Sequence, residues 1–411
     1  MTQEITRAPG TPEAFTLCLN RLADPTGTWR AEQDAILNDR AFETAQNTIT
    51  DWPGYAETPL VSLPALAESL GIKALKIKDE SSRFGLGSFK ALGGAYAVAR
   101  LLQSELSRRL GQPVSMADVT ARAYPDEAAK ITVCCATDGN HGRSVAWGAQ
   151  TFGARCVIFI HATVSEGRKQ AIEAYDAEVR RCPGNYDDSV RTADETAARE
   201  GWFVVSDTSY PGYMDVPRDV MQGYELMAAE AFDALPAPPT HILLQTGVGG
   251  MAAAVAAQAV RRWGAQRPRI ILCDPDQSVC WLASIRAGHP EAVTGDLDTL
   301  MAGLACGEVS ALAWEILRDH ADAVIALTDA SAIAAMRCLA NPLPGDPPLV
   351  AGESAVAGLA ALTLISADEE ARDMLALEPS SIVLLFSTEG DTDPALYEKL
   401  IGKSAASLRS P

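Results

Sequence analysis

The stretch Ser88-Phe89-Lys90-Ala91-Leu92-Gly93-Gly94-Ala95-Tyr96 places a lysine at the start of a predicted helix. A glycine-containing loop and a predicted strand over 74–78 precede it. A lysine kept out of water has a destabilised ammonium, so its pKa falls and its amine becomes a usable nucleophile. A lysine near a helix start is, however, most often a solvated surface residue. Lys90 therefore needs support from other segments before it can be given a chemical role.

Two further segments have the composition of ligand-binding loops. Thr137-Asp138-Gly139-Asn140-His141-Gly142 follows the apolar run 131–136, and Gln245-Thr246-Gly247-Val248-Gly249-Gly250-Met251 follows 241–244 and opens an alanine-rich helix. Glycines let the backbone approach a ligand, and a helix N-terminus offers free N–H groups to an anion. Either loop alone is also typical of a tight strand-to-helix turn. Together with Lys90, in this chain order, they favour a ligand site.

These segments resemble those of the fold type II pyridoxal-phosphate enzymes, the tryptophan synthase β-like group. Lys78-Asp79-Glu80 followed by Ser88-Phe89-Lys90 resembles the lysine segment, and Asp138-Gly139-Asn140-His141 resembles the substrate-carboxylate loop. Gly247 to Gly250 resembles the phosphate loop, and Ser387-Thr388-Glu389-Gly390-Asp391 resembles the segment at the pyridine nitrogen. The resemblance runs from Asp79 to Asp393, most of the chain.

Within this group the chain is similar to the diaminopropionate ammonia-lyase family. The marks of the similarity are 136–143, Asp207-Thr208 with Met221-Gln222-Gly223-Tyr224 downstream, and 387–393. The resemblance implies an α/β fold with two open, twisted, mostly parallel sheets flanked by helices. It also implies a large PLP-binding domain, 1–94 and 214–411, with a smaller α/β domain, 95–213, inserted in it. The catalytic cleft is expected between them, outside the C-terminal ends of parallel strands.

The hydrophobic periodicity agrees with parallel β-α units. It predicts strands over 131–136, 155–160, 178–181, 202–205, 241–244, 269–273, 324–326 and 382–386. It predicts helices over 90–110, 141–152, 165–175, 187–199 and 216–234. Residues 1–60 contain helical pieces with proline breaks, and 111–129 has the composition of a linker or insertion.

The resemblance also implies a role for each candidate site residue. Lys90 would form a Schiff base with pyridoxal 5′-phosphate and act as a general base at the substrate's Cα. The phosphate would lie on the backbone of Gly247, Val248, Gly249, Gly250 and Met251. Asn140 would bond the 3′ oxygen of the cofactor, unless it is a helix cap or turn residue. Thr388, or its neighbour Ser387, would face the pyridine nitrogen.

The substrate is expected on Thr137, Asp138, Gly139 and His141, although a histidine in such a turn is more often a structural donor. In the dehydratases of the group the position of Asp138 is uncharged. A carboxylate there would repel the carboxylate of an amino acid unless the substrate also carries a positive charge. The β-ammonium of 2,3-diaminopropionate supplies that charge. Asp138 could bind this amine, move its proton, or take the Cα proton from the face opposite Lys90.

Asp207 is the second acid that the resemblance places near the cleft, and a structural turn cap is its alternative role. Two bases on opposite faces would let one enzyme process both isomers. The resulting hypothesis is α,β-elimination of D- and L-diaminopropionate to pyruvate and two ammonia. A serine or threonine dehydratase, or another β-lyase, uses the same lysine and loops. A PLP-binding protein without turnover is the alternative from another class.

Composition limits the remaining possibilities. The chain has 411 residues, enough for two domains, and its net charge of −19 argues against nucleic acid or an anionic membrane as a partner. No apolar run reaches the ~18 residues of a membrane helix, and residues 1–5 lack the features of a signal peptide. We therefore expect a cytoplasmic enzyme. The resemblance implies a small amino-acid substrate and a homodimer.

The cysteines indicate no metal site. There are nine, none in a C-x-x-C arrangement, so neither a zinc site nor a disulfide framework is predicted. Cys280 and Cys306 flank the same loop-rich region, and whether they pair stays open.

Overall fold

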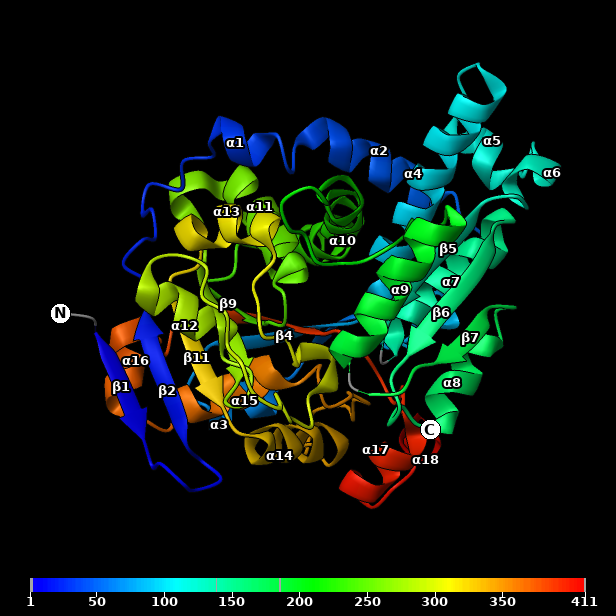
Figure 1. Ribbon diagram of the computed structural model, residues 1–411. Helices are drawn as coiled ribbons and strands as arrows, with labels where there is room; N and C mark the ends of the chain where they lie inside the picture. The colour runs from blue at the N-terminus through cyan, green and yellow to red at the C-terminus, as the bar shows by residue number, and fades with distance from the viewer. Residues whose placement is uncertain (1–2, 138, 185, 410–411) are drawn as a thin grey trace. The chain divides into compact units, whose positions relative to one another are not determined.

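The computed structural model describes residues 3–137, 139–184 and 186–409 (Figure 1). The chain divides into unit 1, which comprises Met1–Ile36, Glu57–Ser82 and Met227–Pro411, and unit 2, which comprises Leu37–Ala56 and Arg83–Leu226. The whole of the expected inserted domain, 95–213, lies in unit 2, which also takes 37–56, 83–94 and 214–226. Lys90 therefore belongs to unit 2, whereas the expected phosphate and pyridine segments belong to unit 1.

The described part of unit 1 is built on an eight-stranded sheet. Its strands are β1 (Glu4–Arg7), β2 (Phe15–Leu19), β3 (Leu60–Ser62), β4 (Ala74–Asp79), β9 (His241–Gln245), β10 (Arg269–Pro275), β11 (Ala323–Leu327) and β12 (Ile382–Ser387). The spatial order is β1-β2-β11-β10-β9-β12-β4-β3. The strands from β11 to β4 run parallel, while β1, β2 and β3 pair antiparallel. This confirms the mostly parallel α/β architecture.

Helices cover this sheet. They are α1 (Ala31–Asp34), α3 (Pro64–Ser69), α11 (Gly250–Trp263), α12 (Cys280–Ala287), α13 (Ala311–His320), α14 (Asp329–Ala340), α15 (Ala357–Ser366), α16 (Glu369–Leu375), α17 (Pro394–Ile401) and α18 (Ala405–Arg409). In Figure 1, α11 and α13 lie on one side of the sheet and α14 and α15 on the other. Strand β9 is buried along its whole length, as expected for a parallel strand between two helical layers.

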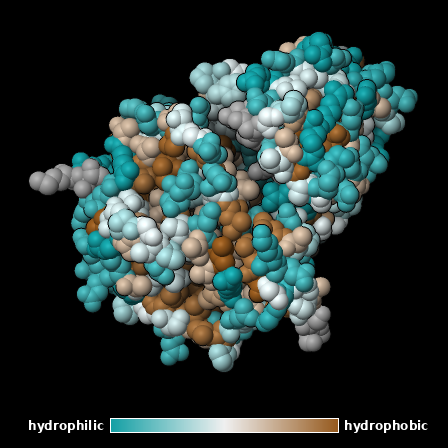
Figure 2. Space-filling model, turned by 60° about the horizontal axis from the view of Figure 1, so that its bottom comes forward, coloured by the Kyte–Doolittle hydropathy of each residue, from teal (hydrophilic) through white to brown (hydrophobic). Residues whose placement is uncertain are grey.

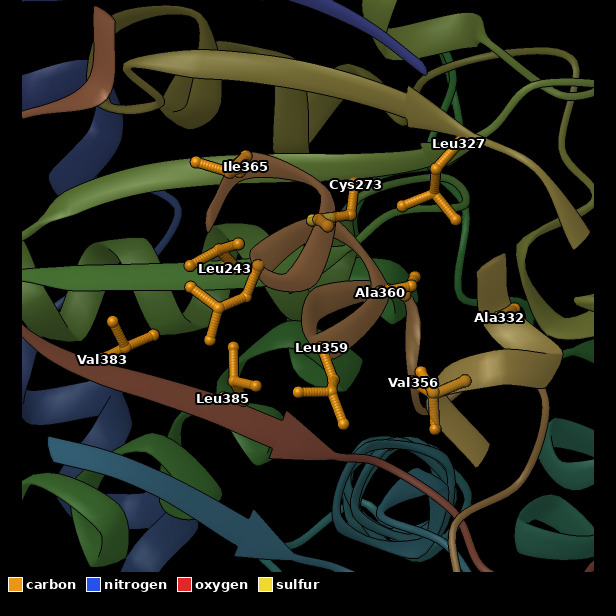
Figure 3. Close-up of a cluster of buried hydrophobic side chains, with 14 of the residues drawn as sticks. Leu243, Cys273, Leu327, Ala332, Val356, Leu359, Ala360, Ile365, Val383 and Leu385 are labelled. Atoms are coloured by element: carbon orange, nitrogen blue, oxygen red, sulfur yellow. The ribbon is translucent and has the colours of Figure 1, made fainter. Parts of the chain in front are cut away.

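The main core of unit 1 lies between the sheet and α15 (Figure 3). Leu243 of β9 is in register with Leu385 of β12, and both point toward Leu359 of α15. Each of these side chains is almost completely removed from water. Burying one such side chain stabilises the fold by roughly 1.5–3 kcal/mol, so this layer holds the ends of β9 and β12 in fixed positions.

Unit 2 contains a separate four-stranded sheet in which β7-β6-β5-β8 run parallel. The strands are β5 (Thr132–Ala136), β6 (Arg155–Ile160), β7 (Glu178–Arg181) and β8 (Phe203–Val204). The helices are α2 (Asp39–Thr50), α4 (Lys90–Leu110), α5 (Met116–Thr120), α6 (Pro125–Ala128), α7 (Asn140–Phe152), α8 (Glu166–Glu173), α9 (Tyr186–Glu200) and the part of α10 (Asp215–Asp233) that ends at Leu226. Because β5 and β8 are parallel neighbours, the segments that follow them leave at the same edge of the sheet.

Two regions differ from the sequence-based expectation. Residues 1–60 contain helices α1 and α2, but also the antiparallel strands β1 and β2, which the periodicity does not predict. The segment 111–129 contains the short helices α5 and α6 and is not an open linker. Val114 and Val119 are buried there, so this segment packs on the rest of unit 2.

The surface agrees with the composition. On the face shown in Figure 2, hydrophilic residues cover much of the surface and apolar residues gather in patches. Within the described ranges, no helix combines the length and the apolar character needed to cross a membrane.

Candidate functional site

Lys90 is the first residue of α4, as the sequence predicts. Its side chain is 20% exposed, and its Nζ lies 2.5 Å from Oδ2 of Asp207. The rings of Phe89 and Tyr224 lie beside it, with centroids 5.3 Å and 5.8 Å from Nζ. Aromatic rings and a carboxylate therefore surround the ammonium. Lys90 is not the solvated surface lysine that its position at a helix start would usually produce.

Lys78 is the other lysine of the predicted lysine segment, and its surroundings are different. Its Nζ lies 2.6 Å from Oε2 of Glu230 and donates to the backbone oxygen of Thr58 at 2.7 Å. Lys78 and Glu230 are both buried. This pair is internal to unit 1 and holds β4 in place, so Lys78 is not a candidate nucleophile.

Asp207 follows β8 and is the partner of Lys90. Burial alone would raise the pKa of Asp207, but the ammonium of Lys90 and the imidazole of His141 outweigh it and hold the pKa well below its usual range. The carboxylate is therefore ionised at neutral pH. Its contact with Lys90 shows more than the turn-capping role that the sequence leaves open.

His141 lies at the start of α7 and is buried. Its Nε2 is 2.8 Å from the carbonyl oxygen of Val205, which can only accept, so Nε2 carries a hydrogen. Its Nδ1 is 3.8 Å from Oδ2 of Asp207. The structural donor role expected for a histidine in this turn is thus present. Its other nitrogen faces the Lys90–Asp207 pair.

Hydrogen bonds join Thr137 to the start of α7. The Thr137 hydroxyl accepts from the N–H groups of Gly139 and Gly142 at 3.1 Å and 3.2 Å. Gly139 is the N-cap residue of α7 and Asn140 is its first residue, so Asn140 is not the helix cap. Asp138, which the sequence singles out for substrate choice, lies outside the described residues.

In unit 1, the loop after β9 has the geometry of an anion cradle. Gly249 is the N-cap of α11 and has φ +96°, a left-handed conformation that favours glycine. A Cβ at Gly249 would lie 2.2 Å from Cζ2 of Trp281, so no larger residue fits. Gly250 and Met251 form the first turn of α11, where backbone N–H groups have no helical partner. The loop therefore presents the donors that a phosphate requires.

Side chains from neighbouring elements hold this loop, and the motif alone does not predict them. The Thr246 hydroxyl donates to the buried Asp274 of β10 at 2.5 Å. The indole N–H of Trp281 donates to the backbone oxygen of Gly247 at 3.0 Å. Asp274 also accepts from the backbone N–H groups of Trp281 and Leu282, both at 3.1 Å. Loop and helix α12 are thus joined through one carboxyl group.

The pyridine segment lies at the end of β12, which pairs with β9. Nε2 of Gln245 donates to the Thr388 hydroxyl at 2.9 Å and to the backbone oxygen of Phe386 at 2.8 Å. The Ser387 hydroxyl is buried and has no hydrogen-bond partner among the described residues. The two candidate hydroxyls therefore differ, since Thr388 accepts a hydrogen bond from Gln245 whereas Ser387 has no partner among the described residues, and the O–H of either could still donate.

These features fit the cofactor that the resemblance implies. The loop 247–251 offers backbone donors to a phosphate. The buried hydroxyl of Ser387 has no protein partner among the described residues, and the ring nitrogen of a bound cofactor could supply one. Cys280 and Cys306 are both free thiols. Cys280 Sγ lies 3.6 Å from the oxygen of Gly247, and a Cβ on Gly247 would meet Cys306 Sγ at 3.0 Å, so both thiols border the loop.

The structure thus brings the predicted residues together in two groups. Unit 2 gathers Lys90, Asp207 and His141, and unit 1 gathers the loop 247–251 with Ser387 and Thr388. The sequence analysis gave no role to Gln245, Asp274, Trp281 or Tyr224. Gln245 and Tyr224 do lie inside the quoted motifs, which was the available signal. Asp274 and Trp281 carry no local signal, because their contacts join segments far apart in the chain.

Comparison with known proteins agrees with this chemistry. The family described as "Pyridoxal-phosphate dependent enzyme" matches residues 52–388. Diaminopropionate ammonia-lyase from Salmonella typhimurium (strain LT2) is 40% identical over 365 residues, covering 86% of this chain and 90% of that protein. The enzyme from Escherichia coli (strain K12) is 41% identical over 360 residues, covering 86% of this chain and 89% of that protein.

Solved structures are similar over almost the whole chain. The diaminopropionate ammonia lyase from Escherichia coli in complex with an aminoacrylate-PLP azomethine reaction intermediate has a TM-score of 0.84 at 36% identity, covering 94% of this chain and 96% of that one. The family match, the sequence relatives and the similar structures all indicate a pyridoxal-phosphate-dependent enzyme. The chain therefore belongs to the diaminopropionate ammonia-lyase family of pyridoxal-phosphate-dependent enzymes.

Proposed function

We propose that this chain catalyses the pyridoxal-phosphate-dependent α,β-elimination of 2,3-diaminopropionate, in its D and L forms. Diaminopropionate and one water give pyruvate and two ammonia. The observation that carries the proposal is the Lys90–Asp207 pair at 2.5 Å. It keeps one amine partly shielded from water beside a group that can accept a proton. The names of the relatives support the choice of substrate.

When bound, pyridoxal phosphate supplies an electron sink for the electrons left at Cα. Lys90 would provide the amine that holds the cofactor and, once released, the base that takes the proton from Cα. Asp207 would hold the ammonium form of Lys90 through its negative charge. A protonated His141 would help to keep Asp207 ionised, because its Nδ1 lies 3.8 Å from that carboxylate.

The cofactor would be held by neutral groups of unit 1. The backbone N–H groups of 247–251 would bind the phosphate. Ser387 would bond the pyridine nitrogen, because its buried hydroxyl finds no partner among the described residues. Thr388 is the alternative donor, since its hydroxyl accepts from Gln245 and keeps its own hydrogen. Asn140 of unit 2 would bond the 3′ oxygen, as the resemblance implies.

Asp138 would decide the substrate. Its carboxylate would attract the β-ammonium of diaminopropionate and disfavour serine, which has no positive charge at Cβ. With Thr137, Gly139 and His141 it would form the loop that receives the amino acid. Asp138 would also take the Cα proton of the D isomer, while Lys90 takes that of the L isomer.

A substrate panel tests the proposal. Purified protein loaded with pyridoxal phosphate should release pyruvate from both isomers of diaminopropionate, with two ammonia per pyruvate. Serine and threonine should be turned over more slowly. Faster release from serine, with one ammonia per pyruvate, would instead identify a dehydratase, and absence of turnover on every substrate would identify a binding protein.

The variant Asp138→Asn tests the stereochemical part. It should abolish turnover of D-diaminopropionate and spare much of the activity on the L isomer. Asp176→Asn is a matched control, since Asp176 is an aspartate of unit 2 that bonds Gln150 at 2.6 Å on the surface. Equal loss of activity on both isomers in Asp138→Asn would contradict the two-base assignment.

We further propose that the enzyme acts as a cytoplasmic homodimer. The family resemblance supports the dimer. Light scattering on purified protein should give twice the chain mass of 43.5 kDa. A monomeric mass would refute the dimer.

A further inference from the structure

The ring of Tyr224 lies beside Lys90, although Tyr224 has no part in the function proposed above. Tyr224 is 1% exposed and lies on α10. Its ring centroid is 5.8 Å from Nζ of Lys90 and 4.6 Å from the ring of Phe89. Phe89 immediately precedes the lysine, so Tyr224 packs directly against the start of α4.

Two glycines make the space that this arrangement needs. A Cβ at Gly93 would lie 2.5 Å from Cε1 of Tyr224, and a Cβ at Gly223 would lie 1.9 Å from the backbone oxygen of Leu92. Any side chain at either position would push α10 away from α4 or displace the Tyr224 ring. Gly93 belongs to the motif 88–96 and Gly223 to the motif 221–224. The packing of Tyr224 against α4 explains why both positions need glycine.

The Tyr224 hydroxyl is buried and has no hydrogen-bond partner among the described residues. A buried hydroxyl without a partner is destabilising, so one that is retained is expected to serve a group that changes state. Burial raises the pKa of Tyr224, and the nearby ammonium of Lys90 opposes this rise. The phenol therefore keeps its hydrogen at neutral pH and lies within electrostatic reach of Lys90.

Lys90 needs different partners in its two protonation states. Its ammonium form is held by the Asp207 carboxylate at 2.5 Å. Its neutral amine has a lone pair that requires a donor, and an ionised carboxylate cannot donate. The Nε2 hydrogen of His141 is already engaged by Val205. A phenol O–H beside the amine is a suitable donor.

We propose that Tyr224 is a positioning residue for Lys90, and that its hydroxyl donates a hydrogen bond to the neutral Lys90 amine. This bond would stabilise the base form and fix the direction of its lone pair. The inference rests on the proposed function, because only there does Lys90 act as a free amine. Among the described residues, the titratable groups that interact with the amine or with its partner Asp207 are Asp207, Tyr224, His141 and Cys135 of β5.

The test uses cofactor-free protein. The pH dependence of trace acetylation of Lys90 by acetic anhydride, followed by mass spectrometry, gives the apparent pKa of this amine. Tyr224→Phe keeps the ring in its space but removes the hydroxyl. It should raise the apparent pKa of Lys90 by about half a unit to one unit, because the neutral form loses a hydrogen bond.

Tyr96→Phe is the matched control, since Tyr96 is another buried tyrosine of unit 2 and lies on α4 itself. It should leave the pKa of Lys90 unchanged. In loaded enzyme, Tyr224→Phe should lower kcat about tenfold and change KM less than about twofold. An unchanged or lowered pKa of Lys90 in Tyr224→Phe would overturn the inference.

The proposed function has its own readout. Borohydride reduction of cofactor-loaded wild-type protein, followed by peptide mapping, should place the cofactor on Lys90. A label elsewhere would overturn the proposed function together with the inference. A label on Lys90, combined with an unshifted pKa in Tyr224→Phe, would overturn the inference alone.

Discussion

Asp207 in unit 2 and Asp274 in unit 1 both lie at or just after the C-terminal end of a parallel strand, but their pKa values move in opposite directions. Asp207 contacts a cation, Lys90, and its pKa is held below the usual range. Asp274 is completely buried among the neutral donors of Thr246, Trp281 and Leu282. Burial raises the pKa of Asp274 to about 7.

This difference shows how the two units divide the chemistry. Unit 2 pairs opposite charges, so the Asp207 carboxylate stabilises the ammonium form of Lys90. Unit 1 offers uncharged backbone N–H and hydroxyl donors. Such donors suit an anionic ligand such as a phosphate. An ionised Asp274 beside the loop 247–251 would repel a phosphate, and its raised pKa limits that repulsion.

The largest effect is expected from removing the cation of unit 2. Lys90→Met should reduce pyruvate formation at least about a thousandfold, because the amine base is lost. Asp207 should then resemble Asp274, with a pKa above its usual range. Lys169→Met is the control, since Lys169 is also ion-paired in unit 2, 3.0 Å from Glu173, but outside the site. More than a tenth of wild-type activity in Lys90→Met would contradict the assignment.

The next effect concerns the cradle of unit 1. Gly249→Ala should raise the dissociation constant of the cofactor at least about tenfold, because the new Cβ collides with Trp281 and the loop must move. Titration of cofactor-free protein measures this. Gly264→Ala, at the other end of α11, also has positive φ but nothing within 4 Å. It should cost about 1 kcal/mol of stability and leave affinity intact. Equal affinity losses would refute the cradle.

Asp274 should make the wild-type protein less stable as the pH rises. Its folded pKa of about 7 lies above the unfolded value, so the folded state binds the extra proton and stability falls between about pH 4 and pH 7. The fall should amount to roughly 2–4 kcal/mol. In Asp274→Asn the slope should become smaller by this amount, because Asp219, whose pKa burial raises to about 6, still titrates in the same range. Urea unfolding across this range measures it, and an unchanged slope in the variant would count against the shift.

Asp207 should show the opposite sign. Its folded pKa lies below the unfolded value of about 3.9, so the ionised carboxylate stabilises the fold above that pH and the contribution is lost as the pH falls further. Asp207→Asn should cost roughly 1–3 kcal/mol at pH 7. The difference from wild type should shrink below about pH 4. A difference independent of pH in acid unfolding would show that Asp207 is not paired in solution.

The smallest effect on stability is expected for the hydrogen bond between Gln245 at the end of β9 and Thr388 just after β12. Gln245→Met and Thr388→Val each remove one side of the 2.9 Å hydrogen bond. Their double-mutant cycle should give a coupling of about 0.5–1.5 kcal/mol in urea unfolding. The pair Thr363→Val and Gln245→Met is the control, because Thr363 bonds only within α15, to Leu359. A coupling near zero for Gln245 and Thr388 would show that this hydrogen bond does not contribute to stability.

The sequence predicts the repeating core well and the side-chain partnerships poorly. Helix α4 and strands β6 and β7 have the predicted bounds, because local periodicity decides them. Lys90 and the two glycine loops can be found in the sequence because each lies in a short, continuous motif. Their order along the chain indicates the chemistry. Tyr224, Gln245 and Asp274 contact residues that are dozens to more than a hundred positions away. Such contacts arise only from packing, so no local pattern specifies them.

The hairpin β1–β2 also escapes prediction, because its strands are short and its partner is β11, about 300 residues later in the chain. β2 pairs antiparallel with β11 from Phe15↔Leu327 to Leu19↔Ala323. Without this hairpin, β11 would be an open sheet border of unpaired N–H and C=O groups with the apolar sequence Ala323–Leu327. Such borders associate with other chains and seed aggregates. Strand β2 therefore covers this border of the sheet, and its removal would expose an apolar strand that is prone to aggregation.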